Sequence, residues 1–99
     1  MSSEKGKCYK NIGEVLDVLK CLNNEKRLMI VCRILSQGEQ NVGELVEFIG
    51  LSPSALSQHL AVLRESQIVK TRKTQQTVYY SIADSKVKKL VDTMHKLYC

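Results

Sequence analysis

The sequence predicts a mostly α-helical domain that carries a single β-hairpin, in the order α-α-α-α-β-β-α. Apolar residues recur at helical spacing through residues 12–63 and again after residue 86. Between these regions, residues 68–82 are rich in β-branched and aromatic residues, which favour strands. No linker or repeat divides the 99 residues, so we expect one domain over residues 11–99 behind a flexible basic arm at residues 1–10.

The first two predicted helices are separated by a polar interruption. Asn11 followed by Glu14 fits a capping box and opens a first helix with one apolar stripe. The pair Asn23-Asn24 ends that helix and starts a second one at about residues 25–36. Because the second helix is apolar nearly all round, we expect it to be the central buried helix.

The next two predicted helices form a helix-turn-helix. Asn41 with Glu44 is another capping-box pattern, and it opens a short helix at residues 42–49 that Gly50 ends. Ser52 can cap the following helix, and Pro53 sits at its first position, where a missing N–H costs nothing. Two short helices joined by a tight turn are the defining arrangement of this motif.

The helix that begins at Pro53 has an apolar face and an uncharged polar face. Leu56, Leu60 and Leu63 form the apolar stripe, as they would in any amphipathic surface helix. The short hydrogen-bonding side chains opposite them suit the major groove of B-DNA, where base edges offer a readable pattern of donors and acceptors. We therefore expect DNA contacts from this segment, through Ser52, Ser54, Ser57, Gln58, His59 and Arg64. For His59, packing or a phosphate contact is a better interpretation than metal binding.

A basic hairpin is predicted directly after this helix, from residues 68–73 and 76–82. Its tip lacks the Asn-Gly or Asp-Gly pair of a two-residue loop, so we expect a longer, flexible loop. The hairpin predicts the wing of a winged helix-turn-helix, although a solvated charged hairpin would look similar. Its residues expected near DNA phosphates are Lys70, Arg72, Lys73 and Gln75.

A last helix, capped by Asp84 or Ser85, carries another apolar stripe that needs a surface to pack on. The first helix is the expected partner, within the chain or across a dimer. We favour a homodimer through the first and last helices, because winged helices that read operators usually need two half-sites.

The charge balance points to a nucleic-acid partner and not to a membrane. Fifteen Lys and Arg against ten Asp and Glu leave a net charge of +5. No segment is long and apolar enough for a membrane span, and residues 1–10 do not look like a signal peptide, so we expect a cytoplasmic protein. The four cysteines show neither a CxxC pair nor zinc-finger spacing, which argues against a structural disulfide framework.

With this order of elements, the chain resembles the ArsR family of bacterial winged helix-turn-helix repressors over about residues 12–99. The resemblance is carried mainly by the run Ser52-Pro53-Ser54-Ala55-Leu56-Ser57-Gln58-His59-Leu60, with support from residues 22–28, 42–45 and 77–80 and from Arg64. It implies a homodimer that binds a palindromic double-stranded DNA operator and dissociates when an inducer binds.

The resemblance is strongest to the branch of this family that senses persulfides and oxidants with two cysteines. Cys32 in the second helix and Cys99 after the last one occupy the matching positions, whereas Cys8 and Cys21 match neither. Reactive sulfur species or oxidants would then be the inducer, and the two thiols would form a disulfide or a polysulfide bridge. Cys99 carries its own carboxylate at the negative end of a helix, which disfavours its thiolate, so we expect Cys32 to attack first.

Other interpretations remain open. Cys32 would be inert if it were only a small buried hydrophobe, and Cys99 if it were frayed. The chain would then be an ArsR-type regulator of a metal or another ligand. However, residues 42–49 lack the cysteines of one metal-sensing group, and Asp92 with His95 offers too few zinc ligands, so we expect no metal and no cofactor.

Two further interpretations concern the role of the whole chain. A winged-helix module that binds only protein, or an anti-repressor that displaces another DNA-binding protein, would use the same fold. An enzyme is not expected, because the sequence shows no nucleophile–base constellation and no glycine-rich phosphate loop.

Overall fold

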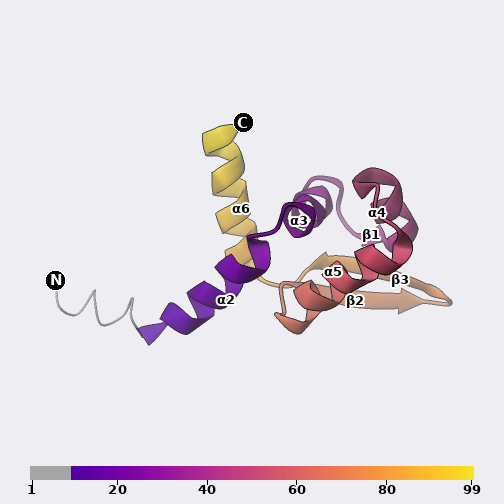
Figure 1. The fold of residues 1–99 in the computed structure, drawn as a ribbon, viewed down its shortest axis with the longest axis horizontal. Helices are drawn as coiled ribbons and strands as arrows, with labels where there is room; N and C mark the ends of the chain where they lie inside the picture. Colours follow the sequence, from indigo (N-terminus) through magenta and orange to yellow (C-terminus); the bar gives the residue numbers. More distant parts are fainter. Residues whose placement is uncertain (1–9) are drawn as a thin grey trace.

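The computed structural model describes residues 10–99, so Cys8 and nearly all of the predicted basic arm lie outside the described residues. The predicted order of helices and hairpin is confirmed, with one short strand added (Figure 1). The elements are α2 (Ile12–Leu22), α3 (Glu25–Gln37), β1 (Gln40–Asn41), α4 (Val42–Ile49), α5 (Pro53–Glu65), β2 (Val69–Thr74), β3 (Thr77–Ile82) and α6 (Ser85–Tyr98).

Three of the predicted helix starts are confirmed in atomic detail. The capping box of α4 is complete, because Asn41 Oδ1 accepts from the Glu44 N–H and Glu44 Oε1 accepts from the Asn41 N–H. Ser52 Oγ accepts from the Ala55 N–H at the start of α5, with Pro53 at the first helical position. Asp84 caps α6 through the Lys86 N–H. These caps satisfy backbone donors that have no partner within the helix.

The capping box predicted for Asn11 and Glu14 is wrong. Asn11 precedes α2, but its side chain makes no capping hydrogen bond to the helix. The carboxylate of Glu14 instead accepts from Lys86 Nζ at 2.6 Å, which ties α2 to the first turn of α6. A cation from a distant helix therefore takes the acceptor on which the predicted box depended.

The sheet differs from the prediction in two places. It has three antiparallel strands in the order β1-β3-β2, and the two-residue strand β1 was not predicted. The register of the hairpin pairs Thr74 with Thr77, so the predicted long loop is wrong and only Gln75 and Gln76 connect the strands. Gln75 takes a φ of 54°, which is the left-handed conformation that Gly or Asn adopts more readily.

The hydrophobic core lies where α3, α4, α5 and the base of the hairpin meet. The side chains that are almost fully enclosed there are Ile30, Val31, Leu45, Leu56, Leu60, Leu63, Ile68 and Val87. The predicted leucine stripe of α5 is therefore confirmed. The helix expected to be the central buried one, α3, buries Ile30, Val31 and Ile34 but leaves Cys32 exposed to solvent.

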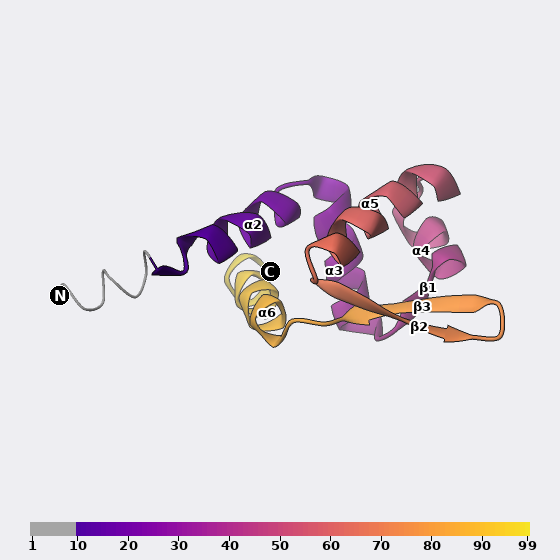
Figure 2. The same ribbon diagram turned by 90° about the horizontal axis from the view of Figure 1, so that it is seen from below.

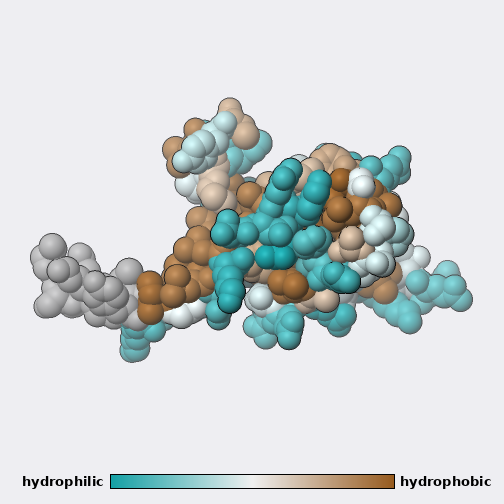
Figure 3. Space-filling model, viewed as in Figure 1, coloured by the Kyte–Doolittle hydropathy of each residue, from teal (hydrophilic) through white to brown (hydrophobic). Residues whose placement is uncertain are grey.

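Helices α2 and α6 extend to one side of this body, and the hairpin extends to the other (Figures 1 and 2). The predicted apolar stripe of α2 lies on the surface: Ile12, Val15, Leu16 and Leu19 are 42–55% exposed. This stripe is visible as apolar surface along α2 in Figure 3. Within residues 10–99, one face of α2 therefore has no packing partner.

Among residues 10–99, no helix has the length and apolar character needed to cross a bilayer.

Candidate nucleic-acid interface and thiol pair

The outer face of α5 presents a row of small polar side chains to solvent. Its leucines turn inward to the core, which leaves Ser54, Ser57 and Gln58 exposed on the opposite face. Arg64 is exposed near the end of the helix. Ser57 and Arg64 also border a shallow groove of about 520 Å³ between α5 and Tyr80 of β3. The helix therefore offers hydrogen-bonding groups and one cation on a single open surface.

His59 lies at the edge of that surface and is half-buried. Its Nδ1 is 3.4 Å from Nη1 of Arg27, a residue of α3. The same guanidinium donates from Nε to the carbonyl oxygen of Cys21 at 2.6 Å. His59 therefore lies against a cation that also holds the end of α2.

The hairpin presents Lys70, Lys73 and Gln75 to solvent, whereas Arg72 is already engaged in an ion pair. The Arg72 guanidinium donates to both carboxylate oxygens of Glu39, at 2.7 and 3.1 Å, and its carbon atom Cζ lies 4.8 Å from the centre of the Tyr79 ring. Arg72 thus fixes the hairpin to the segment before α4, and a phosphate would have to compete with Glu39 for it.

Hydrogen bonding between Arg72 and Glu39 changes the acidity of both groups. The guanidinium hydrogen bond to Glu39 lowers the pKa of that carboxyl group, and the nearby positive charges of Arg72 and Lys70 act in the same direction. Reciprocally, the carboxylate raises the pKa of Arg72, first through the hydrogen bond and then through its charge. Both residues are therefore held in their charged forms at neutral pH.

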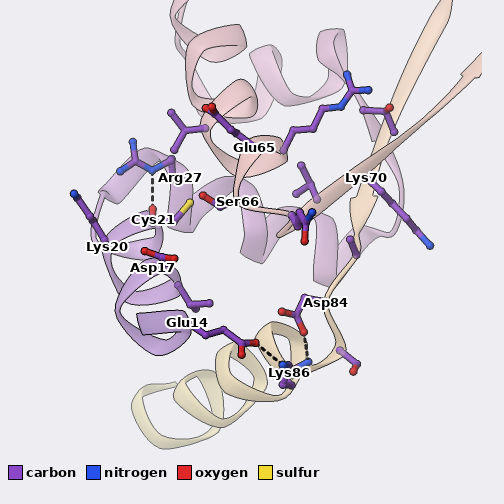
Figure 4. A pocket seen from close by; sticks show the side chains of 18 residues that line it. Glu14, Asp17, Lys20, Cys21, Arg27, Glu65, Ser66, Lys70, Asp84 and Lys86 are labelled. Carbon is purple, nitrogen blue, oxygen red and sulfur yellow. Dashed lines mark hydrogen bonds and ion pairs between the residues drawn. The ribbon is translucent and has the colours of Figure 1, made fainter. Parts of the chain in front are cut away.

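A broad cleft of about 1540 Å³ separates α2 and the start of α6 from the end of α5 and from β2 (Figure 4). Its walls carry charges of both signs, including Asp17, Lys20, Glu65 and Lys70. Cys21 borders the cleft but is only 4% exposed. The cleft therefore presents charged surface and gives solvent little access to the Cys21 thiol.

Cys32 and Cys99, the two cysteines predicted to form a switch, are both exposed. Cys99 follows the last residue of α6, and its backbone N–H donates to the His95 carbonyl at 2.8 Å. The pKa of the Cys32 thiol is raised, first by partial burial and second by the negative charge of Cys99.

This environment bears on the predicted order of attack. A raised pKa leaves less of the Cys32 thiol as thiolate at neutral pH, and the thiolate is the nucleophile. The acidity of Cys32 therefore does not favour it as the first attacker. Its exposure, however, removes the alternative that it is a buried, inert hydrophobe.

Some residues of the site were not anticipated from the sequence. Glu39 holds Arg72, Arg27 contacts His59, and Arg33 beside Cys32 stacks on Phe48 with 4.3 Å from Cζ to the ring centre. Each pair joins residues from different elements, so neither helical nor strand spacing reveals it. Across residues 10–99, no three potential metal-ligating side chains of the His, Cys, Asp and Glu types gather together.

Comparison with known proteins supports this geometry. A family model described as bacterial regulatory proteins of the arsR family matches residues 24–71. The transcriptional activator HlyU of Vibrio cholerae is 47% identical over 91% of this chain and 82% of its own length. The biofilm growth-associated repressor of Xylella fastidiosa is 41% identical over 91% of this chain and 78% of its own length.

Solved structures of such relatives share the fold. HlyU from Vibrio cholerae superposes with a TM-score of 0.87 at 47% identity, covering 91% of this chain and 97% of the other. The transcriptional repressor BigR from Xylella fastidiosa gives a TM-score of 0.87 at 40% identity, covering 96% of each chain. The similarity therefore extends through the helix-turn-helix, the hairpin and the flanking helices.

Proposed function

The chain belongs to the ArsR family of bacterial regulatory proteins, and on that basis we propose that it is a homodimeric transcriptional repressor switched by Cys32 and Cys99. The reduced protein binds a palindromic DNA operator, and bonding of the two cysteines releases it. The observation that carries this proposal is the placement of the two thiols: Cys32 of α3 and Cys99 at the end of α6 are both free and exposed.

The proposed DNA contacts follow from what each element exposes. Ser54, Ser57 and Gln58 of α5 can donate to and accept from base edges in the major groove. Lys70 and Lys73 of the hairpin are exposed and supply phosphate contacts, which position the protein without reading sequence. Because Arg27 contacts Nδ1 of His59, only the other ring nitrogen, Nε2, is left for a DNA contact.

The proposed dimer interface is the exposed apolar face of α2 together with α6. Leu16 and Leu19 of α2 and Leu90 of α6 remain 37–55% exposed in the single chain. An apolar groove of about 440 Å³ runs between the two helices. Covering this face with the same face of a second copy removes apolar surface from water and places two α5 helices on one side of the dimer.

The proposed chemistry needs two thiolates and one oxidised sulfur. The first thiolate attacks the outer sulfur of an organic persulfide R–S–SH, and the S–S bond of the persulfide breaks. The organic thiolate RS⁻ departs, and the attacking cysteine becomes a protein persulfide. The second thiolate attacks the sulfur attached to the protein and expels HS⁻, which leaves a disulfide between Cys32 and Cys99. Two electrons pass from the cysteines to the departing sulfur. If Cys99 first acquires its own extra sulfur, its persulfide anion makes the second attack, and the bridge is a trisulfide.

A bond between Cys32 and Cys99 joins α3 to the end of α6. The last turn of α6 lies on the surface, since Leu97 and Tyr98 are 74% and 86% exposed. Fixing this end to α3 changes the angle between the dimerising helices and the helix-turn-helix. A coupling free energy of about 1–3 kcal/mol lowers operator affinity roughly 5–150-fold, which is enough to release a promoter.

One alternative function keeps the DNA interface and changes the signal. In it, the chain is an ArsR-type regulator of a metal or another ligand, and its cysteines are inert. A second alternative is that the chain activates transcription, since one relative is named an activator and another a repressor. A protein that displaces another repressor from DNA acts as an activator with the same interface.

The test of the proposed function is operator binding in each redox state. A DNA fragment selected from a genomic library is titrated at fixed salt with reduced protein and with protein treated with glutathione persulfide. We expect the treated protein to bind at least about tenfold more weakly, and Cys32→Ser and Cys99→Ser to bind equally well before and after treatment. Cys21→Ala is the matched control and should still respond.

Retention of affinity by the treated wild-type protein would contradict the thiol switch. Metal or ligand titrations on the same fragment would then test the alternative.

A further inference from the structure

A groove of about 570 Å³ opens beside Cys32, between α3, α4 and α6. Its walls are mostly apolar, formed by Leu28, Met29, Leu35, Phe48 and Val91. Grooves of this size hold small organic molecules, whereas hydrogen peroxide and inorganic polysulfide need no such volume. The space beside the thiol is therefore larger than the simplest oxidants require.

Arg33 lies in this groove next to Cys32 in the chain, and its charge has no ionic partner among residues 10–99. The guanidinium stacks on Phe48 with its Cζ atom 4.3 Å from the ring centre. Its Nε is buried and has no hydrogen-bond partner within the described part of the chain. A guanidinium without an ionic partner favours a carboxylate ligand, to which it can make charge-assisted hydrogen bonds.

The rim of the groove carries the opposite charge as well. Glu25 and Asp92 are exposed carboxylates at its edge, and His95 lines it from α6. A ligand with both a carboxylate and an ammonium group can therefore meet Arg33 and a carboxylate at the same time. An inorganic polysulfide carries only negative charge, and hydrogen peroxide carries none.

We propose that this groove binds the organic part of a zwitterionic persulfide, built on a cysteine-containing amino acid or small peptide, with its carboxylate at Arg33. The inference rests on the proposed function, since Cys32 must react with a persulfide. Bound in this way, the ligand presents its outer sulfur to Cys32. The Cys32 thiolate attacks that sulfur, the S–S bond of the ligand breaks, and the ligand leaves as its thiolate. Arg33 is thus a specificity-determining residue that touches the substrate and takes no part in the electron transfer.

The experiment follows persulfidation of Cys32 by mass spectrometry in full-length Cys99→Ser protein, where Cys99 cannot resolve the product. Glutathione persulfide and sodium tetrasulfide are compared over a range of concentrations, with Arg33→Gln as the variant and Lys26→Gln, another α3 cation, as the control. With glutathione persulfide we expect saturating rates and a loss of about tenfold at low concentration in Arg33→Gln. The tetrasulfide rates should rise linearly and stay within about twofold of the parent in both variants.

Equal rates of glutathione persulfide reaction in Arg33→Gln and in the parent would overturn the inference. An equal fall with both reagents would also overturn it, because Arg33 would then act on the fold or on the thiol and not on the ligand. These two outcomes leave the thiol switch intact, since Cys32 still reacts. If Cys32 reacted with neither reagent, the proposed function itself would fail, and the inference would fail with it.

Discussion

Arg27 and His59 meet between α3 and α5, with Nη1 of Arg27 3.4 Å from Nδ1 of His59. The same guanidinium holds the Cys21 carbonyl at the end of α2 with a 2.6 Å hydrogen bond from Nε. One side chain therefore links a proposed dimerising helix to the proposed DNA-reading helix. The contact with His59 is a hydrogen bond in the tautomer whose proton is on Nε2.

Replacing Arg27 should loosen this junction. Arg27→Gln removes two contacts made by a half-buried cation, and we expect the free energy of unfolding to fall by about 1–2 kcal/mol. Because the position of α5 depends on the same contacts, affinity for the operator should fall as well. Urea denaturation and fluorescence anisotropy measure the two effects. Lys88→Gln, which removes an exposed α6 cation, is the control for net charge. Equal losses of affinity in both variants would contradict a positioning role for Arg27.

The hairpin lysines should govern the salt dependence of DNA binding. Lys73→Gln is expected to weaken binding to all DNA sequences alike and to reduce the slope of log K against log salt by about one. Gln58→Ala is expected instead to lower affinity for the operator by about 1–3 kcal/mol with little change in slope. Titrations at several salt concentrations, on operator and on random DNA, separate the two behaviours. A sequence-selective loss in Lys73→Gln would show that the hairpin reads bases.

The ion pair between Glu39 and Arg72 should stabilise the hairpin only above a certain pH. Hydrogen bonding to Arg72 lowers the pKa of Glu39, so the stabilisation is complete above the unfolded value of about 4.3 and is lost as pH falls through the lower folded value. NMR titration of the Glu39 carboxyl carbon measures this directly. In Arg72→Gln the midpoint should rise towards the ordinary glutamate value. An unchanged midpoint would mean that the ion pair does not form in solution.

The acidity of Cys32 should depend on Cys99. Burial is the larger cause of the raised pKa and the charge of Cys99 the smaller, so Cys99→Ser should lower the midpoint of Cys32 without restoring the ordinary thiol value. Iodoacetamide alkylation of Cys32, followed against pH by peptide mass spectrometry, reports this midpoint. Lys96→Gln, a change in the same terminal turn, is a control for the charge of the helix end. If Cys99→Ser left the midpoint of Cys32 unchanged, the two thiols would not interact electrostatically in solution.

The apolar face of α2 should support the dimer. Leu16 is 55% exposed in the single chain, and Leu16→Glu would bury a carboxylate without a partner at the proposed interface. We expect the dimer dissociation constant to rise at least about a hundredfold, measured by sedimentation equilibrium. Operator affinity should fall with it, because two half-sites no longer act together. Phe48→Glu, on a 46% exposed apolar residue of α4 outside the proposed interface, is the control. A Leu16→Glu protein that remained dimeric would place the interface elsewhere.

Local patterns predicted most of the fold, because caps and periodicity act over a few residues. The caps at Asn41, Ser52 and Asp84 were predicted correctly, since each needs only neighbouring residues in the chain. The two-residue strand β1 was missed because it is too short to have a strand pattern and exists only through its pairing with β3.

Contacts between distant segments account for the other differences. The box at Asn11 was wrong because Glu14 pairs with Lys86 from another helix. Likewise, no local pattern in the sequence indicates that Glu39 holds Arg72. Helical periodicity also could not predict the exposure of Cys32, because its neighbours on the helix are apolar. Tertiary packing leaves the face of α3 that carries Cys32 open to solvent.

The most direct test of the central claim is intact-mass measurement and peptide mapping of the reduced full-length protein after treatment with glutathione persulfide. The account predicts one cross-linked product that joins the peptide containing Cys32 to the peptide containing Cys99, directly or through added sulfur atoms. It should accumulate in parallel with loss of operator binding. Free Cys32 and Cys99 thiols in protein that has lost its operator would contradict the account, as would a bridge through Cys21 or Cys8.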